Sequence, residues 1–170
     1  MHRHTRLRRI GILCLHCLRN AAYYRAWNAA PQIRRREQFW ISLNGNFIDT
    51  CLLEWCKLFG DLRAMHHWSK VVSDPTDFLA RLHESTKLDT AQFEAYRLEV
   101  RMYRDKFVAH LDNLNSAQIP RIQPAIDSAR LLYNYLVAEE DDAGAFHNAP
   151  RSANAQYQNY LREGRAAHRA

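Results

Sequence analysis

The stretch FEAYRLEVRMYRDKFVAHLD, residues 93–112, has the clearest helical pattern in the chain. Its large apolar side chains recur at spacings of three and four residues, and this rhythm places them on one stripe of a helix. They are Phe93, Tyr96, Val100, Tyr103 and Phe107. Asn113 and Pro120 follow, so we expect the helix to end soon after His110. The stretch therefore predicts a helix that packs by one face and carries a group of charged side chains at its end.

The rest of the sequence is typical of an all-α protein. Hydrophobic residues make up 47% of the chain, with only five glycines and five prolines, which favours a packed helical fold over disorder. Apolar patterns predict a helix over residues 6–29, a long one over 31–59 and a closing one from Ile122 onward. Two more helices should begin at N-caps, at Asp74 before a proline and at Asp89 three residues before a glutamine.

Composition divides the chain into one helical domain and a tail. The 31–59 helix is apolar over much of its girth, so it should be central in a bundle or shared with a second copy. We expect a helical bundle with a long central helix pair over residues 1–142. The C-terminal tail, residues 143–170, is expected to hold a short helix near 157–161.

The charge of the chain favours an anionic partner. The formal net charge is +6 and the pI is about 9.4, and nucleic acid is the commonest partner of such a protein. On the predicted helix, Arg97, Arg101 and Arg104 lie on one side at spacings of four and three. Lys106 shares a face with His110, so we predict that Lys106, Arg97 and Arg101 bind successive phosphates of RNA. Further arginines on the 6–29 helix form either a solvated face, which we favour, or an RNA-facing surface: Arg6, Arg8, Arg9, Arg19 and Arg25.

Arg104 and His110 together suffice for phosphodiester chemistry without a metal. A histidine gains and loses a proton near neutral pH, and an arginine offers a permanently charged fork of donors to a phosphate. Asp105 could orient either side chain, although all three could also be plain surface charges. In an ideal α-helix Arg104 and His110 point about 120° apart, so two antiparallel copies would bring them together better than one. Two further histidines, His66 and His67, point in different directions and are expected at packing or surface positions.

Four cysteines allow two interpretations. Cys14 and Cys17 form a CxxC pattern, and Cys51 and Cys56 a looser pair, which together could hold zinc. However, Cys14 and Cys17 continue an apolar stripe of the first helix, and Cys51 continues a stripe of the second. We therefore expect buried thiols that pack as small hydrophobic groups, with no metal and no cofactor. No run approaches the roughly 20 apolar residues of a membrane span, so we expect a cytoplasmic protein without a membrane partner.

The segment Arg104-Asp105-x4-His110 resembles the R-[polar]-x4-6-H signature of HEPN domains. The local sequence RDKFVAHLD is similar to the abortive-infection, AbiU-like branch of that family. A long apolar helix that ends in WCKLFGD at residues 55–61, a His67-Trp68 pair and a later helix opening on proline agree with the resemblance, which covers roughly residues 35–140. The resemblance implies a HEPN-like helical bundle that forms a homodimer.

The same resemblance implies a metal-independent endoribonuclease that acts as a toxin or antiphage defence effector. Arg104, His110 and Asp105 of two copies would form the catalytic cleft. A neutralising antitoxin is among the partners the family implies. Some HEPN toxins carry a tyrosine two residues after the motif histidine, where a nucleotidyltransferase antitoxin modifies them. Asp112 occupies that position here, so an antitoxin would act by binding. The alternative is a non-catalytic HEPN module that binds RNA or a partner protein.

Overall fold

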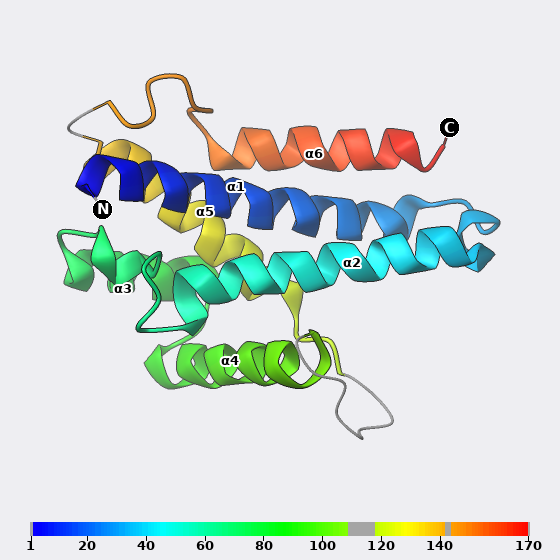
Figure 1. The fold of residues 1–170 in the computed structure, drawn as a ribbon, viewed down its shortest axis with the longest axis horizontal. Helices are drawn as coiled ribbons and strands as arrows, with labels where there is room; N and C mark the ends of the chain where they lie inside the picture. The colour runs from blue at the N-terminus through cyan, green and yellow to red at the C-terminus, as the bar shows by residue number, and fades with distance from the viewer. Residues whose placement is uncertain (1, 109–117, 142–143, 170) are drawn as a thin grey trace.

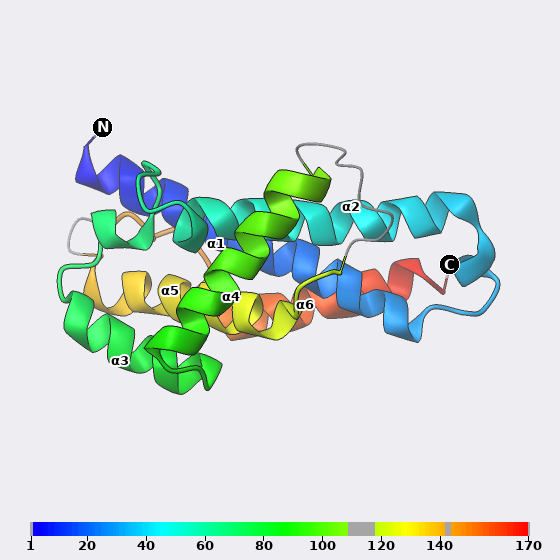
Figure 2. The same cartoon turned by 90° about the horizontal axis from the view of Figure 1, so that it is seen from below.

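A computed structural model describes residues 2–108, 118–141 and 144–169, and this part of the chain is helical without a strand (Figures 1 and 2). Its α-helices are α1 (Arg3–Ala26), α2 (Gln38–Trp55), α3 (Pro75–Thr86), α4 (Thr90–Tyr103), α5 (Ile122–Glu139) and α6 (Ala153–Ala167). Two π-helical turns extend α2 and α4, namely η3 (Cys56–Gly60) and η5 (Arg104–Val108). Short 3-10 turns are η1 (Trp27–Ala29), η2 (Arg34–Arg36) and η4 (Trp68–Lys70). The prediction of an all-α fold is confirmed, and none of the helices described has the length and apolar composition of a membrane span.

Helix α1 lies at the centre of the bundle. It packs against α2, α5 and α6, and its most extensive contacts are with α2 (Figures 1 and 2). The predicted stripe is buried along the whole of α1, on the side where the helix meets its neighbours, whereas Arg8, Arg9 and Ile12 are exposed. The buried residues of the stripe are Leu7, Ile10, Cys14, Cys17 and Ala21. A long helix pair, α1 and α2, thus forms the spine onto which the other helices pack.

The second predicted helix starts later than its sequence pattern indicated. Residues 34–36 form a 3-10 turn and α2 begins at Gln38. Trp40 and Phe47 at its start are only half-buried, and full burial begins at Ile48. The first half of α2 therefore runs past the main core, which begins where α4 and α5 reach the helix.

The caps predicted for α3 and α4 are confirmed. The Asp74 carboxylate accepts hydrogen bonds from the N–H groups of Thr76 and Asp77, both at 3.0 Å. Asp89 accepts from the N–H of Gln92 at 2.8 Å, and the Gln92 side chain accepts from the Asp89 N–H at 3.0 Å. Each cap satisfies N–H groups that have no partner within the helix, and so fixes where the helix begins.

An aromatic cluster joins α2, α4 and α5. Trp55 is fully buried, stacks on Phe59 at a centroid distance of 5.4 Å and meets Tyr96 of α4 edge-on at 5.3 Å. Its indole N–H donates to the Ser128 hydroxyl of α5 at 2.8 Å. The Tyr96 hydroxyl donates to the carbonyl of Arg121 at 2.8 Å, before the start of α5. Helix α4 is thereby fixed against the bundle by its apolar face, as the pattern from Phe93 to Tyr103 predicted.

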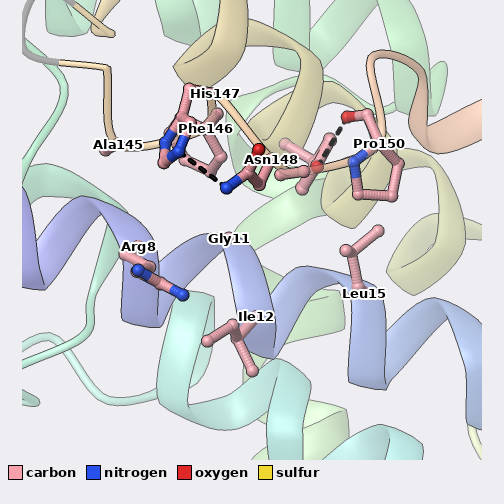
Figure 3. Close-up of a pocket in the computed structure, with 11 residues that line it drawn as sticks. Arg8, Gly11, Ile12, Leu15, Ala145, Phe146, His147, Asn148 and Pro150 are labelled. Carbon is pink, nitrogen blue, oxygen red and sulfur yellow. Dashed lines mark hydrogen bonds between the residues drawn. The ribbon is translucent and has the colours of Figure 1, made fainter.

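The C-terminal segment packs on the same core as the rest of the chain. Helix α6 is longer than the short helix predicted near 157–161, and Tyr157 is buried against the bundle. Before it, Phe146 lies on α1 at Gly11, where a Cβ atom would come within 2.3 Å of the Phe146 ring. A hollow of about 230 Å³ opens between α1 and residues 145–150, with Arg8 on one side and His147 and Asn148 on the other (Figure 3).

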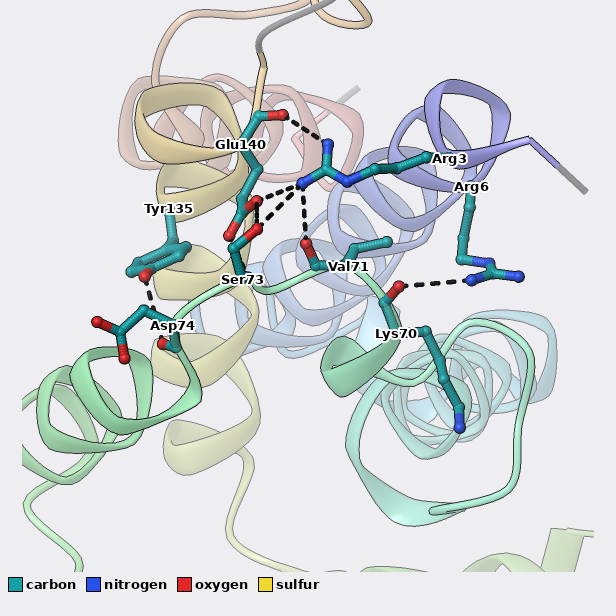
Figure 4. Close-up of polar contacts among 8 residues, drawn as sticks. All are labelled: Arg3, Arg6, Lys70, Val71, Ser73, Asp74, Tyr135 and Glu140. Atoms are coloured by element: carbon teal, nitrogen blue, oxygen red, sulfur yellow. Dashed lines mark hydrogen bonds and ion pairs between the residues drawn. The ribbon is translucent and has the colours of Figure 1, made fainter.

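The acidic residues at the end of α5 act as hydrogen-bond acceptors. Helix α5 ends at Glu139, and Glu140 after it is buried. The Glu140 carboxylate accepts from the Ser73 N–H at 2.6 Å, from the Ser73 hydroxyl at 2.8 Å and from Arg3 (Figure 4). This clasp ties the start of α1, the loop before α3 and the end of α5 together.

Replacing Glu140 by alanine should destabilise the protein much more than the same change at its neighbour. The variant Glu140→Ala leaves the Ser73 N–H without its acceptor and Arg3 without its buried partner, so we expect a loss of about 2–3 kcal/mol in the free energy of unfolding. Glu139 makes an exposed ion pair with Arg81 at 3.3 Å, and Glu139→Ala should cost less than about 1 kcal/mol. Urea unfolding followed by circular dichroism measures both, and equal losses would contradict the clasp.

Candidate functional site at the end of α4

Arg104 stands at the point where α4 changes into the π-helical turn η5. Its Nε donates to Asp105 Oδ1 at 2.8 Å, and its Nη1 donates to Asp61 Oδ2 at 2.5 Å. The side chain is 17% exposed. Hydrogen bonding to Asp105, and then to Asp61, raises the pKa of Arg104 further above its usual range although burial opposes this. The guanidinium is therefore a permanent cation that two carboxylates hold in one orientation.

Two π-helical turns border this site. The Asp61 N–H donates to the carbonyl of Cys56 at 2.9 Å, the five-residue spacing of a π-helix, and thereby ends η3. Turn η3 packs on α4, and turn η5 packs on α2. Such turns occur mostly as single insertions and frequently at functional sites. The 120° offset between Arg104 and His110 assumed an α-helix, so it does not describe the backbone after Tyr103.

The predicted arginine stripe converges on the turn at Gly60 and Asp61. Arg97 Nη1 donates to the Gly60 carbonyl at 2.7 Å, and Arg97 also pairs with Glu94. Arg101 Nε lies 3.6 Å from Asp61 Oδ1. All three arginines therefore share one side of α4, as the spacing predicted, and they bind this turn to the helix.

The three predicted RNA-binding residues differ in exposure. Arg97 is only 8% exposed, because Gly60 and Glu94 take up its guanidinium. Arg101 and Lys106 are partly exposed, and the Arg101 side chain is 39% exposed. A surface hollow lined by Asp61, Leu62, Arg63 and Arg101 opens beside them. RNA contact by Arg101 and Lys106 stays a prediction that fits their exposure, whereas Arg97 is engaged within the fold.

Tyr103 anchors the end of α4 to α2. Its hydroxyl donates to Asp49 Oδ1 at 2.7 Å. Burial, together with the hydrogen bond to Asp49, raises the pKa of Tyr103. The residue directly before Arg104 is therefore fixed, which limits how far Arg104 can move.

His110 lies outside the described residues, as does Asp112. His67 is buried, and its Nδ1 accepts from the Ser69 N–H at 3.3 Å, where it caps the turn η4. Burial lowers the pKa of His67 to about 4, so it is neutral at pH 7. This agrees with the expected packing position, whereas His66 is partly exposed on the other side of the loop.

Asp61 is the site residue that the sequence analysis did not single out. The only signal for it was the Gly-Asp pair that ends the long apolar helix. An acid at a helix end is common, and its partner Arg104 lies 43 positions further along the chain. Only the packing of η3 against α4 reveals that Asp61 orients Arg104.

The four cysteines are free thiols in the core, which confirms the prediction that they pack as small hydrophobic groups. Cys17 and Cys51 bring α1 and α2 close, with their sulfur atoms 3.6 Å apart. In the part of the chain that the structure describes, no three His, Cys, Asp or Glu side chains gather as ligands for a metal ion.

Comparison with protein-family models, with curated proteins and with solved structures finds no match for this chain. The functional argument therefore depends on the residues and their geometry.

The Asp61–Arg104 pair should contribute more stability than the Asp61–Arg101 pair. A double-mutant cycle with Asp61→Asn and Arg104→Gln should give a coupling energy of about 1 kcal/mol, because the 2.5 Å hydrogen bond is largely shielded on the arginine side. The matched cycle with Arg101→Gln should give less than about 0.5 kcal/mol, since both groups are more than a third exposed and 3.6 Å apart. Urea unfolding of the variants measures both cycles, and the reverse order would show that Asp61 does not select Arg104.

Proposed function

We propose that the protein is a metal-independent endoribonuclease of HEPN type that serves as a toxin or antiphage effector. Arg104 would stabilise charge on a phosphate, and His110 would move the proton. The observation that carries this proposal is the oriented, partly buried guanidinium of Arg104 at the open end of α4.

The way Arg104 is held suits it to bind a phosphate. Two of its three nitrogen atoms donate to carboxylates, and no acceptor in the described ranges pairs with Nη2. A fixed cation needs little reorganisation when charge develops on a substrate, and such preorganisation is the usual source of large rate effects. The partial burial of Arg104 strengthens its attraction for an anion, because fewer water molecules screen it.

The reaction would be an in-line transesterification within RNA. His110 as general base accepts the proton of a 2′-hydroxyl, whose oxygen attacks the adjacent phosphorus. Arg104 stabilises the phosphorane-like transition state, and the 5′-oxygen leaves and takes up a proton. The products are a 2′,3′-cyclic phosphate and a 5′-hydroxyl, so DNA is not a substrate.

A second copy of the chain would complete the site. Leu98 and Met102, one turn apart on α4, are 50% and 52% exposed, and Met102 comes two residues before Arg104. Full burial of an exposed side chain of this size is worth about 1.5–3 kcal/mol, so covering the exposed half of each would contribute roughly half as much. A dimer formed across this face of α4 would bring two motif ends into one cleft.

The alternative is a non-catalytic module that binds RNA or a partner protein. One observation favours it: Arg104 already has two acidic partners, as an arginine with a purely structural role would. In such a module Arg104 would hold η3 against α4, and removing it would affect folding more than any RNA cleavage.

The purified protein should cleave single-stranded RNA in excess EDTA and leave 2′,3′-cyclic phosphate ends. Arg104→Ala and His110→Ala should each lower the rate at least about 100-fold, because each removes a group that acts in the transition state. Cleavage is measured on labelled RNA by gel electrophoresis, beside a DNA strand of the same sequence.

Arg151→Ala and His147→Ala serve as matched controls, since both residues are exposed and far from α4 in the chain. They should cleave like the wild type. Cleavage that survives His110→Ala, or cleavage of the DNA strand, would rule out the mechanism. A folded wild type that binds RNA without cleaving it would favour the module.

Charge on the exposed face of α4 should separate the dimer and remove activity. Leu98→Glu with Met102→Glu places like charges opposite each other in the proposed interface, so we expect a monomer and at least a 100-fold loss of cleavage. Ile33→Glu with Phe39→Glu alters apolar residues near the start of α2 that are even more exposed, and this variant should still be a dimer. Analytical ultracentrifugation gives the oligomeric state, and a charged variant that is still a dimer would place the interface elsewhere.

A further inference from the structure

A second basic hollow lies between α1 and the segment that follows α2. It has a volume of about 520 Å³. Four basic or titratable side chains and two apolar ones line it: Arg9, Ile12, Leu13, His16, Lys57 and His66. These residues come from α1, from the π-helical turn η3 and from the loop after it, so the hollow exists only in the folded chain.

Basic side chains outnumber acidic ones among the described residues around this hollow. Arg9 and Lys57 line it and are exposed, and Arg6 of α1 acts on His66 from nearby. Within the described ranges Glu54 is the acid that acts on His66, and it pairs with Lys57 at 3.2 Å. Burial first, and then the charges of Arg9, Lys57 and Arg6, lower the pKa of His66. This excess of basic side chains favours an anion as the occupant of the site.

The floor of the hollow is apolar. Ile12, 44% exposed, and Leu13 lie between Arg9 and His16 on the same helix. A bound inorganic ion would leave this surface uncovered, whereas a nucleotide has both a charged phosphate and a flat apolar base to fill it. Histidine and arginine side chains can also contact nucleotide bases by stacking.

We infer that the hollow formed by Arg9, His16, Lys57 and His66 binds a phosphodiester group of a single-stranded RNA. The inference rests on the proposed function, because the strand it holds is the substrate of the Arg104 site. Residues 61–63 line the other hollow, the one that Arg101 also lines. His66 of the same segment lines the hollow formed with Arg9, His16 and Lys57. A strand that follows this segment would contact both hollows, so cleavage and binding would use different parts of one track.

Binding is best measured on a fluorescein-labelled 2′-O-methyl RNA, which has no free 2′-hydroxyl and is not cleaved. Fluorescence anisotropy at several salt concentrations compares the wild type with Arg9→Gln/Lys57→Gln. The matched control is Arg151→Gln/Arg165→Gln, which removes the same charge from exposed positions near and on α6. Circular dichroism first establishes that both double variants are folded.

We expect the Arg9/Lys57 variant to bind at least about 10-fold more weakly, and its plot of log affinity against log salt to be shallower by about 1, as for the loss of one to two phosphate contacts. The control should change affinity less than about threefold. Equal weakening of both variants, or no binding by the wild type at low salt, would overturn the inference.

The two proposals fail in different ways. If the wild type binds the 2′-O-methyl strand through this hollow but cleaves no RNA, the nuclease fails and the binding site stands. If Arg104→Ala abolishes cleavage while Arg9→Gln/Lys57→Gln binds and cleaves like the wild type, the nuclease stands and the hollow has no part in it.

Discussion

The buried indole of Trp55 organises the packing of the central helices. It stacks on Phe59, meets Tyr96 of α4 and donates to Ser128 of α5, so a single side chain fixes three helices relative to one another. An indole N–H without an acceptor in this core would cost about 1–3 kcal/mol, which makes the position of Ser128 as important as the apolar contacts. The end of α2 therefore sets where α4 can lie.

The electrostatics of the candidate site follow from that arrangement. Because α4 packs beside η3, its arginine stripe faces the turn at Gly60 and Asp61. Arg97 then donates to the Gly60 carbonyl, and Arg104 donates to the Asp61 carboxylate. The guanidinium of Arg97 is held in hydrogen bonds within the fold, and the guanidinium of Arg104 is oriented by two carboxylates. Segment 61–66 contributes residues to two hollows in which basic lining side chains outnumber acidic ones, and this asymmetry supports the proposed binding of an RNA strand.

Much of the helical architecture could be predicted from local chemistry. The caps at Asp74 and Asp89, the buried stripe of α1 and the apolar face of α4 depend on residues within a few positions of each other, so short stretches of sequence predict them. The start of α2 and the length of α6 were harder to predict from the sequence. Apolar residues at 40–47 give the same helical pattern whether or not a neighbouring helix covers them. The polar composition of 143–170 gives no sign that Phe146 contacts α1 at Gly11 or that α6 is as long as it is.

Four features could be predicted from the residues alone: the all-α class, the helix starts that carry capping residues, the burial of Cys14, Cys17 and Cys51, and the common side of Arg97, Arg101 and Arg104. These features depend on spacing along one helix. The packing of the helices was needed to show that Asp61 orients Arg104, that Arg97 is buried and that Arg9, Lys57 and His66 line one hollow. These contacts join residues from different elements, so their proximity depends on how α1, η3 and α4 pack rather than on local periodicity.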